Sequence, residues 1–197
     1  MYEVEVKVRA DHDDVRDLLA ELGAEAVNEV TQEDTYYDAP HREFAETDEA
    51  LRVRRETPEI ETPENEGGSE ADAEPFAELT YKGPLVEAES KSRREVETAV
   101  EDGASADAIL DALGFDPAAT VRKDRERFAL DDFTVTLDSV DGLGEFVEVE
   151  TETTEDDEAL EAAREKAYEI LRDLGLSPDD QIRTSYLGLL LERESDD

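Results

Sequence analysis

The sequence contains no cysteine and no tryptophan, and only two of its 197 residues are histidine. The absence of cysteine excludes disulfide frameworks, thiolate zinc sites and cysteine nucleophiles. His12 lies in an acidic stretch that opens a predicted helix, and His41 lies in a loop beside Pro40. We expect no functional role for either imidazole. Any chemistry must therefore come from carboxylates, hydroxyl groups, lysines and arginines.

Long apolar runs are also lacking. No run approaches the roughly 20 residues that a membrane-spanning helix needs, and the charged N-terminus lacks the apolar core of a signal peptide. We therefore expect a cytoplasmic protein without a membrane partner. The length suits a single domain over residues 1–197 with a substantial buried core.

Positive charge is scarce, with 20 Lys+Arg against 58 Asp+Glu and a formal net charge of −38. Such a charge repels phosphate backbones, so general nucleic-acid binding is not expected. Lysine is especially rare, at five residues against 15 arginines, and the apolar residues are mostly small. This composition is typical of halophiles, in which molar salt screens self-repulsion. Disorder is the competing explanation, and the periodic patterns described next argue against it.

Period-two alternation of apolar and polar residues predicts about eight strands. The candidates lie near residues 2–9, 30–38, 50–56, 76–83, 89–100, 119–130, 131–140 and 145–152. Helical periodicity appears at residues 11–23, 105–114, 155–175 and 179–192. Suitable caps flank these helices: Asp11, Ser105 and Ser177 at the N-termini, and Gly23, Gly114 and Gly175 at the C-termini. We expect the helices to pack on an apolar outer face of the sheet.

The rare basic residues are concentrated on the polar face of the predicted strands. Eight of the 20 have this parity: Lys7, Arg52, Arg54, Lys82, Arg93, Lys123, Arg125 and Arg127. A very acidic protein is expected to place Asp, Glu and Thr at solvent-facing strand positions. An ordinary half-solvated sheet alternates in the same way. The position of the cations nevertheless indicates that this face lines a specific site and does not simply face solvent. Seven carboxylates share the parity: Glu3, Glu5, Glu95, Glu97, Asp138, Glu148 and Glu150.

These features predict an α+β fold, in which a closed eight-stranded antiparallel barrel encloses the charged face and helices cover its outside. Two like charges about 4 Å apart repel by about 4 kcal/mol at an effective dielectric near 20, so a charged interior needs counter-charges. Paired carboxylates suit Mg²⁺ or Mn²⁺, and lysines and arginines suit phosphate oxygens. Internal salt bridges alone are the alternative, disfavoured because buried ion pairs often lose more in desolvation than they return. Residues 57–75, rich in Glu and Pro, predict a flexible acidic loop without chemistry.

The N-terminal sequence Glu3-Val4-Glu5-Val6-Lys7 resembles the ExExK motif of the CYTH superfamily, the triphosphate tunnel metalloenzymes. Further resembling segments follow in order along the chain: Tyr36-Tyr37-Asp38, Leu51-Arg52-Val53-Arg54, Leu79-Thr80-Tyr81-Lys82-Gly83-Pro84, Ser92-Arg93-Arg94-Glu95-Val96-Glu97, Val121-Arg122-Lys123-Asp124-Arg125, Leu137-Asp138 and Glu148-Val149-Glu150. Within the superfamily, the length and the C-terminal Thr184-Ser185-Tyr186-Leu187 most resemble the CyaB branch, the class IV adenylate cyclases.

This resemblance implies a role for each matching residue. The implied ligands of one or two Mg²⁺ or Mn²⁺ ions are Glu3, Glu5, Asp138, Glu148 and Glu150. The implied substrate-binding cations are Lys7, Arg52, Arg54, Lys82, Arg93, Lys123 and Arg125, and the implied catalytic residues are Lys82, Glu5 and Lys7. Glu95 and Glu97 would support the metal end of the site or orient the cations. Arg127, Lys91 and Tyr36 stay unassigned.

The resemblance further implies a nucleoside triphosphate or inorganic polyphosphate as partner, and a homodimer. The favoured function is cyclisation of ATP to cyclic AMP and pyrophosphate. The alternative is an inorganic, thiamine or nucleoside triphosphatase that releases terminal phosphate. A third hypothesis is a non-catalytic protein that binds polyphosphate or nucleotide in the same barrel.

Overall fold

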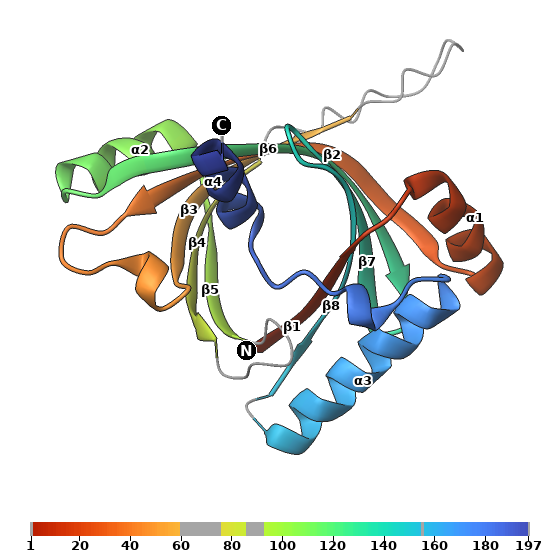
Figure 1. Cartoon of the computed structure of the whole chain (residues 1–197). Helices are drawn as coiled ribbons and strands as arrows, with labels where there is room; N and C mark the ends of the chain where they lie inside the picture. Colours follow the sequence, from red (N-terminus) through yellow and green to blue (C-terminus); the bar gives the residue numbers. More distant parts are fainter. Residues whose placement is uncertain (1, 60–75, 86–92, 155, 197) are drawn as a thin grey trace, which may run out of the picture.

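A closed barrel of eight antiparallel strands forms the centre of the protein (Figure 1). The computed structural model describes residues 2–59, 76–85, 93–154 and 156–196. The strands are β1 (Tyr2–Arg9), β2 (Glu25–Asp38), β3 (Ala50–Pro58), β4 (Phe76–Leu85), β5 (Arg93–Val100), β6 (Asp116–Leu130), β7 (Phe133–Val140) and β8 (Gly144–Thr153). Their order around the barrel is β1-β5-β4-β3-β2-β6-β7-β8. The predicted architecture is thus confirmed.

In the described residues, α1 (His12–Leu22), η1 (Phe44–Glu46) and α2 (Gly103–Ala112) connect strands. The helices α3 (Asp157–Asp173), η2 (Pro178–Asp180) and α4 (Tyr186–Asp196) follow the last strand, and η1 and η2 are short 3-10 helices. Asp11 caps α1 by accepting the Asp13 N–H, and Gly23 ends it with a φ of 77°. The N-cap of α2 is Asp102 and not the expected Ser105, because the Asp102 carboxylate accepts the N–H groups of both Ala104 and Ser105.

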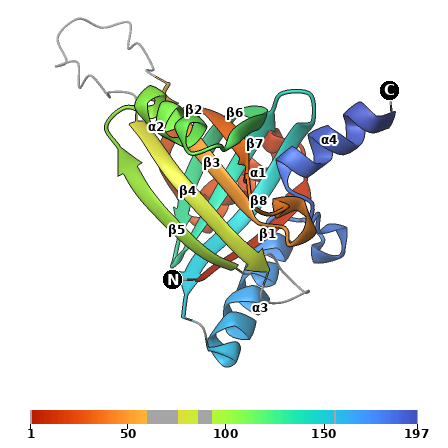
Figure 2. The same ribbon diagram turned by 90° about the vertical axis from the view of Figure 1, so that its left-hand side faces the viewer.

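The apolar faces of the strands point outward beneath α1, α2 and α3. One cluster joins the valines of β1, β7 and β8 to Leu19 of α1 and Leu171 of α3, which are completely buried. A second cluster joins β3 to Leu110 of α2. Figure 2 shows α2 and α3 on opposite sides of the barrel. These three helices therefore close the outer core, as the sequence predicts.

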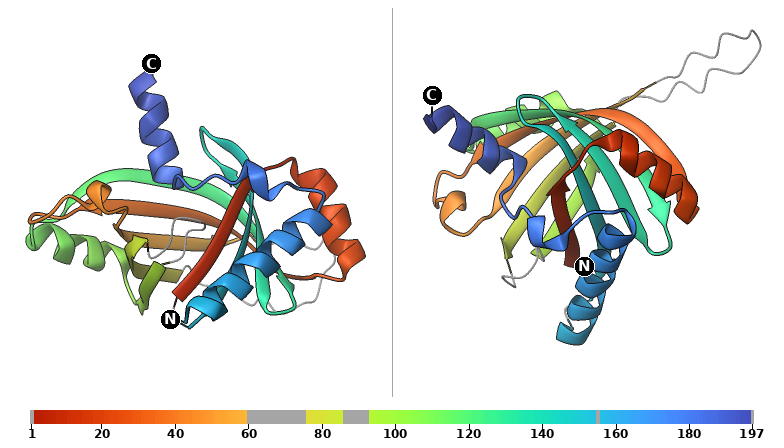
Figure 3. Two further views of the ribbon diagram at one scale, coloured as in Figure 1. Left: turned by 60° about the horizontal axis from the view of Figure 1, so that its bottom comes forward. Right: turned by 45° about the vertical axis from the view of Figure 1, so that its right-hand side comes forward.

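The C-terminal segment departs from the expected helix over residues 179–192. Ser177 caps only the short η2, and α4 begins at Tyr186. Between them the Ile182 N–H donates to the Lys7 carbonyl at 2.7 Å, so this stretch follows β1 and does not coil. It crosses in front of the ring of strands in Figure 1, and α4 projects away from the barrel in Figure 3. Packing on the outer face was thus the wrong expectation for this helix, since Tyr186 enters the interior.

Two predicted segments lie partly outside the described residues. Of the expected loop over 57–75, Thr57 and Pro58 are the last residues of β3, paired with Thr31 and Val30, and residues 60–75 are not described. The expected strand over 89–100 begins at Arg93 in the structure, and 89–92 are not described. Within the described parts of the chain, no helix has both the length and the apolarity that crossing a bilayer requires.

Candidate active site

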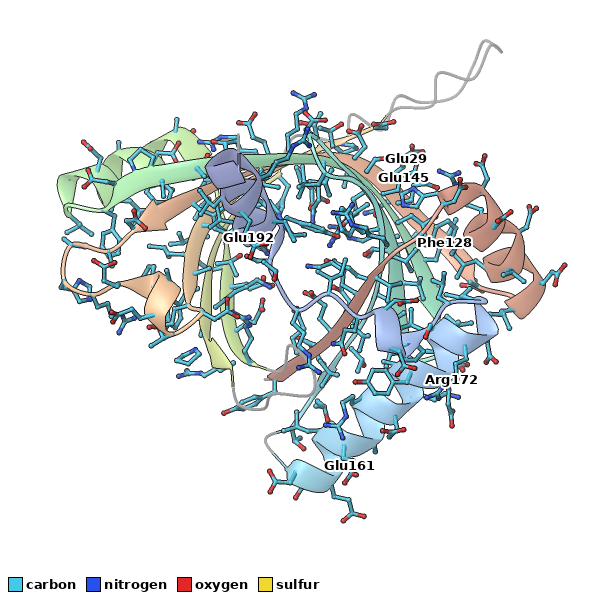
Figure 4. All side chains as sticks on the ribbon, in the orientation of Figure 1. Glu29, Phe128, Glu145, Glu161, Arg172 and Glu192 are labelled. Carbon is cyan, nitrogen blue, oxygen red and sulfur yellow. The ribbon has the colours of Figure 1, made fainter. Side chains whose placement is uncertain are left out.

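The alternation that turns valines outward turns charged side chains into the barrel. On β1, Lys7 is only 2 % exposed although its side chain ends in an amino group. The antiparallel register places Lys7 opposite Glu148 and Glu5 opposite Glu150 on β8. Figure 4 shows side chains crowding the interior of the ring, whereas Glu161 and Arg172 point outward from α3. Strand periodicity therefore builds a charged interior, which we call the lumen.

A cavity of about 890 Å³ occupies the lumen. It follows β3 from Ala50 to Glu56, roughly 20 Å at 3.3 Å per residue. Nine of the chain's 20 basic residues line it: Lys7, Arg52, Arg54, Lys82, Arg93, Lys123, Arg125, Arg127 and Arg183. Ten acidic residues line it as well: Glu3, Glu5, Asp38, Asp48, Glu49, Glu56, Glu78, Glu97, Glu148 and Glu150. Positive and negative charge are thus nearly balanced here, in a protein where acids outnumber bases almost three to one.

Twelve of the fourteen residues to which the family resemblance gives a role line this cavity. The exceptions are Asp138 and Glu95, which lie behind lining cations that they contact. Arg127 and Tyr36, left unassigned in the sequence, also line it. Lys91 falls outside the described residues.

Asp138 of β7 is the centre of a buried ion cluster and has no exposed surface. Its carboxylate accepts Arg125 Nε at 2.6 Å and Lys123 Nζ at 3.2 Å. Arg125 also reaches Glu148 Oε2 at 2.5 Å. Arg125 and Lys123 outweigh burial and hold the pKa of Asp138 well below its usual range. Burial and the neighbouring Arg125 charge lower the pKa of Lys123 to about 8.

Tyr186 enters the lumen from the C-terminal segment and is a residue to which the sequence assigned no role. Its hydroxyl donates to Asp138 Oδ2 at 2.9 Å. Lys7 Nζ lies 4.2 Å and Lys123 Nζ 5.0 Å from the centre of its ring. The aromatic face therefore attracts both lysine ammonium groups. The only sequence signal was its place in the Thr184–Leu187 motif.

Asp34 of β2 is a second residue that the sequence analysis missed. It accepts Arg54 Nε at 2.6 Å and Arg54 Nη2 at 2.7 Å, and Arg52 Nη1 lies 3.4 Å away. The two guanidiniums outweigh burial and depress the pKa of Asp34 far below its usual range. Asp34 thereby fixes Arg52 and Arg54, the two arginines of β3 that line the cavity. The available signal was parity, since Asp34 alternates with Gln32 and Tyr36, which are also buried.

Lys82 of β4 is held between two carboxylates. Its Nζ lies 2.5 Å from Glu95 Oε1 and 3.5 Å from Glu3 Oε1. These charges overcome burial and raise the pKa of Lys82 above its usual value. Burial raises the pKa of Glu95 to about 7, although Lys82 opposes the shift. The lysine therefore stays charged beside a carboxyl that titrates near neutrality.

Arg93 of β5 reaches across the end of the barrel. Its guanidinium donates to the Asp48 carbonyl and to Asp48 Oδ2, both at 2.6 Å. This links β5 to the loop that precedes β3.

The match of the chain to the CYTH domain model extends over residues 1–186, nearly its whole length. The chain belongs to the CYTH family.

Relatives of this CYTH protein are named as adenylate cyclases. It is 38 % identical over 193 residues to "Putative adenylate cyclase MJ0240" of Methanocaldococcus jannaschii, covering 96 % of this chain and 98 % of that one. It is 28 % identical over 187 residues to "Adenylate cyclase CyaB" of Aeromonas hydrophila, covering 94 % of this chain and 86 % of that one.

Solved structures share the CYTH fold. PH1819 of Pyrococcus horikoshii matches with a TM-score of 0.83 and 39 % identity, covering 97 % of this chain and 99 % of that one. HpAC1 from Hippeastrum, described as having a dominant triphosphatase activity, matches with a TM-score of 0.62 and 17 % identity, covering 98 % and 95 % of the two chains. The second likeness concerns the fold alone.

CYTH tunnel enzymes bind triphosphates and generally depend on a divalent metal, and the donors of this lumen fit such an ion. Burial and the charge of Glu3 raise the pKa of Glu150 to about 8, with Glu148 and Glu5 adding to the repulsion. A divalent cation among these carboxylates would offset that repulsion. In the described part of the chain, no three acidic or histidine side chains are gathered closely enough to hold an ion alone. Mg²⁺ commonly uses one or two carboxylates plus substrate phosphates, so the arrangement suits an ion that binds with its substrate.

Proposed function

We propose that this protein is a divalent-metal-dependent adenylate cyclase that converts ATP to cyclic AMP and pyrophosphate. Membership of the CYTH family supports a triphosphate substrate. The names of the two relatives above support the cyclase reaction. The observation that carries the proposal is the gathering of nine scarce basic residues around one cavity.

The basic side chains of the lumen are positioned to bind phosphate oxygens. Arg125 is held by Asp138 and Glu148, and Arg54 by Asp34, so both guanidiniums are ordered before substrate binds. Preordered donors lose little entropy on binding and stabilise charge that develops during phosphoryl transfer. Lys82 and Lys7 add compact point charges that stay in place through Glu95 and Tyr186.

In the proposed reaction, the ribose 3′-hydroxyl oxygen bonds to the α-phosphorus and releases its proton to solvent, while the bond between the α-phosphorus and the pyrophosphate oxygen breaks. Negative charge accumulates on the departing pyrophosphate, and the arginines and lysines of the lumen neutralise it. We assign Glu3, Glu5, Glu148 and Glu150 to the metal. A Mg²⁺ or Mn²⁺ ion held there would supply further charge neutralisation and would favour ionisation of the attacking hydroxyl.

The sequence resemblance implies that Asp138 binds the metal, and we propose a different role for this residue. Its oxygens are occupied by Lys123, Arg125 and Tyr186. A carboxylate with three donors has little capacity left for a metal ion. We therefore assign Asp138 to orienting the phosphate-binding cations.

Hydrolysis of the terminal phosphate is the second candidate, because the same lumen would also grip a triphosphate for attack by water. The triphosphatase description of HpAC1 supports this possibility within the shared fold. The two reactions differ in the nucleophile and in the phosphorus that it attacks.

The deciding experiment supplies the purified protein in molar KCl with ATP or with tripolyphosphate, each with Mg²⁺ or Mn²⁺. We expect cyclic AMP and pyrophosphate in equal amounts from ATP, measured by chromatography. Release of orthophosphate from ATP without cyclic AMP would replace the cyclase proposal by the triphosphatase. Binding of either compound without turnover would favour the non-catalytic hypothesis.

A further inference from the structure

The charge of the lumen reverses along two neighbouring strands. Residues of inward parity change from basic to acidic in the same direction on both: Arg52, Arg54 and Glu56 on β3, and Lys82, Thr80 and Glu78 on β4. The antiparallel register pairs Arg52 with Thr80 and Arg54 with Glu78. Over four residues, about 13 Å at 3.3 Å per residue, the wall of the cavity therefore passes from cations to carboxylates.

Three carboxylates line the cavity at this end, which we call the acidic end: Glu56, Glu78 and Glu97. The Thr80 hydroxyl lies 3.3 Å from an oxygen of Glu78 and 3.3 Å from an oxygen of Glu97, so these two carboxylates lie close together. Phe76 and Arg127 also line this end. The acidic end therefore holds more negative than positive charge.

Arg127 is committed to one of these carboxylates. Its Nη1 donates to Glu56 Oε1 at 3.2 Å and its Nη2 donates to Glu56 Oε2 at 2.9 Å. Asn28 Oδ1 accepts a further hydrogen bond from Nη1 at 3.1 Å, and Gln32 Nε2 donates to Glu56 Oε2 at 2.6 Å. Because Glu56 offsets its charge, Arg127 adds little attraction for an anion at the acidic end.

The adjacent Arg52, in contrast, has an unused donor. It lines the cavity and is only 7 % exposed, yet among the described residues its Nε has no hydrogen-bond partner. A buried guanidinium donor without a partner is unfavourable, so this position suits an anionic oxygen from a ligand. Arg52 Nη2 lies 3.7 Å from Glu97 Oε1. The anion position therefore borders directly on the acidic end.

The opposite end of the cavity also carries carboxylates. Asp38, Asp48 and Glu49 line it near Ala50, the first residue of β3. Arg93 and Arg183 line the cavity as well, and Asp48 already holds the Arg93 guanidinium at 2.6 Å. Carboxylates thus border the cationic stretch on both sides. A phosphate chain that is too long for this stretch meets negative charge in either direction.

We propose that Glu56 and Glu78 limit the length of the phosphate chain, so that the lumen accepts a triphosphate and rejects a linear tetraphosphate. The inference rests on the proposed function, because it concerns the same lumen and the same class of substrate. A chain whose terminal phosphate stops at Arg52 and Arg54 is surrounded by cations. One further phosphate would face the carboxylates of the acidic end and lose affinity through repulsion between like charges.

This repulsion should persist in concentrated salt. Salt screens exposed charges strongly and partly buried charges much less. The Glu56 side chain is only 16 % exposed, and Glu78 is half-buried. The four glutamates that we assign to the metal would not act in the same way, because a bound divalent ion would offset their charge.

The test compares two inorganic ligands, tripolyphosphate and linear tetrapolyphosphate, by titration calorimetry in molar KCl with excess Mg²⁺. We expect the wild type to bind tripolyphosphate about tenfold more tightly or better, although the longer chain carries more charge. Glu56→Gln keeps the shape of the side chain, removes its charge and leaves the charge of Arg127 without a counter-ion. It should strengthen tetrapolyphosphate binding about fivefold or more and change tripolyphosphate binding less than about twofold.

Glu78→Gln should act in the same direction. It leaves the pair of Glu56 with Arg127 in place, so it tests the length limit even where Glu56→Gln fails to fold. Glu161→Gln is the matched control, because it removes the same charge from an exposed side chain that points outward from α3. This control should leave the ratio of the two affinities unchanged.

Two results would overturn the inference. The first is a wild type that binds tetrapolyphosphate as tightly as tripolyphosphate, or binds neither. The second is an equal gain for both ligands in the folded lumen variants, which would indicate general electrostatics without a length limit. Formation of cyclic AMP from ATP is a separate measurement. Length preference without cyclic AMP would refute only the cyclase, and cyclic AMP without length preference would refute only the limit.

Discussion

At the residue scale, the lumen separates its carboxylates into two groups with opposite properties. Asp34 and Asp138 each face two cations, and their pKa values are depressed. Glu150 faces mainly other carboxylates, and burial together with the Glu3 charge raises its pKa to about 8. The first group orders basic side chains. Glu150 is therefore largely protonated at neutral pH, and a nearby cation favours its ionisation.

Metal binding should therefore depend on pH. An ion at Glu150 must displace a proton below about pH 8, so the apparent affinity for Mn²⁺ should fall by up to about tenfold per pH unit as the pH decreases from 8. Titration with Mn²⁺ followed by electron paramagnetic resonance measures this slope. Glu150→Gln should bind more weakly and with a smaller slope. A wild-type affinity that is constant between about pH 6.5 and 8.5 would contradict the assignment.

At the scale of elements, each inner strand residue depends on an outer apolar layer that holds the strand in place. β1 shows both sides, because Lys7 points into the lumen while Val6 and Val8 pack beneath α1 and α3. The helices on the outside therefore stabilise the barrel without touching the substrate. Stability and chemistry lie on opposite faces of the same strands.

The substitution Leu171→Ala in α3 tests whether stability and turnover depend on opposite faces of the strands. Leu171 is fully buried, so its truncation should lower the free energy of unfolding by about 2–5 kcal/mol. Urea denaturation in molar KCl measures the change, and turnover per folded molecule should be preserved because Leu171 does not line the cavity. The exposed Ile109→Ala should change stability by less than about 0.5 kcal/mol. Similar losses for the two variants would mean that α3 packing contributes little to the barrel.

At the scale of the whole molecule, charge is divided between a balanced lumen and a strongly acidic remainder. Nine basic and ten acidic residues line the cavity, so nearly all of the net charge of −38 lies on the rest of the chain. Repulsion among surface carboxylates is screened within about 3 Å at 1 M salt and within about 10 Å at 0.1 M. Buried ion pairs are screened far less.

The thermal stability of the protein should therefore depend on the salt concentration. Lowering KCl from about 3 M to about 0.1 M should lower the thermal unfolding midpoint, because surface repulsion then acts over a longer range. Circular dichroism follows the transition, and sucrose of equal osmolarity serves as a control that adds no screening. An unchanged midpoint across this range, or full rescue by sucrose, would refute the interpretation of the composition as halophilic.

The sequence by itself determined which side chains share a face, because a period of two fixes parity within each strand. From parity, thirteen of fifteen residues were correctly assigned to one lining, and closure into a barrel was predicted. Parity does not determine which strands are neighbours. The pairing of β2 with β6, or of β1 with β5, joins residues about 90 positions apart and follows from three-dimensional closure.

Only the tertiary structure decided the partners of each lumen charge. In the folded chain, Asp34 contacts two arginines, Asp138 accepts from three side chains, and Glu150 lies among other carboxylates. The tertiary structure also brought Tyr186 into the barrel and Leu187 to its mouth, because the Ile182 backbone bonds to β1 and interrupts the helix that periodicity predicts. Electrostatic roles depend on distances of a few ångströms between distant segments, and no local pattern encodes those distances.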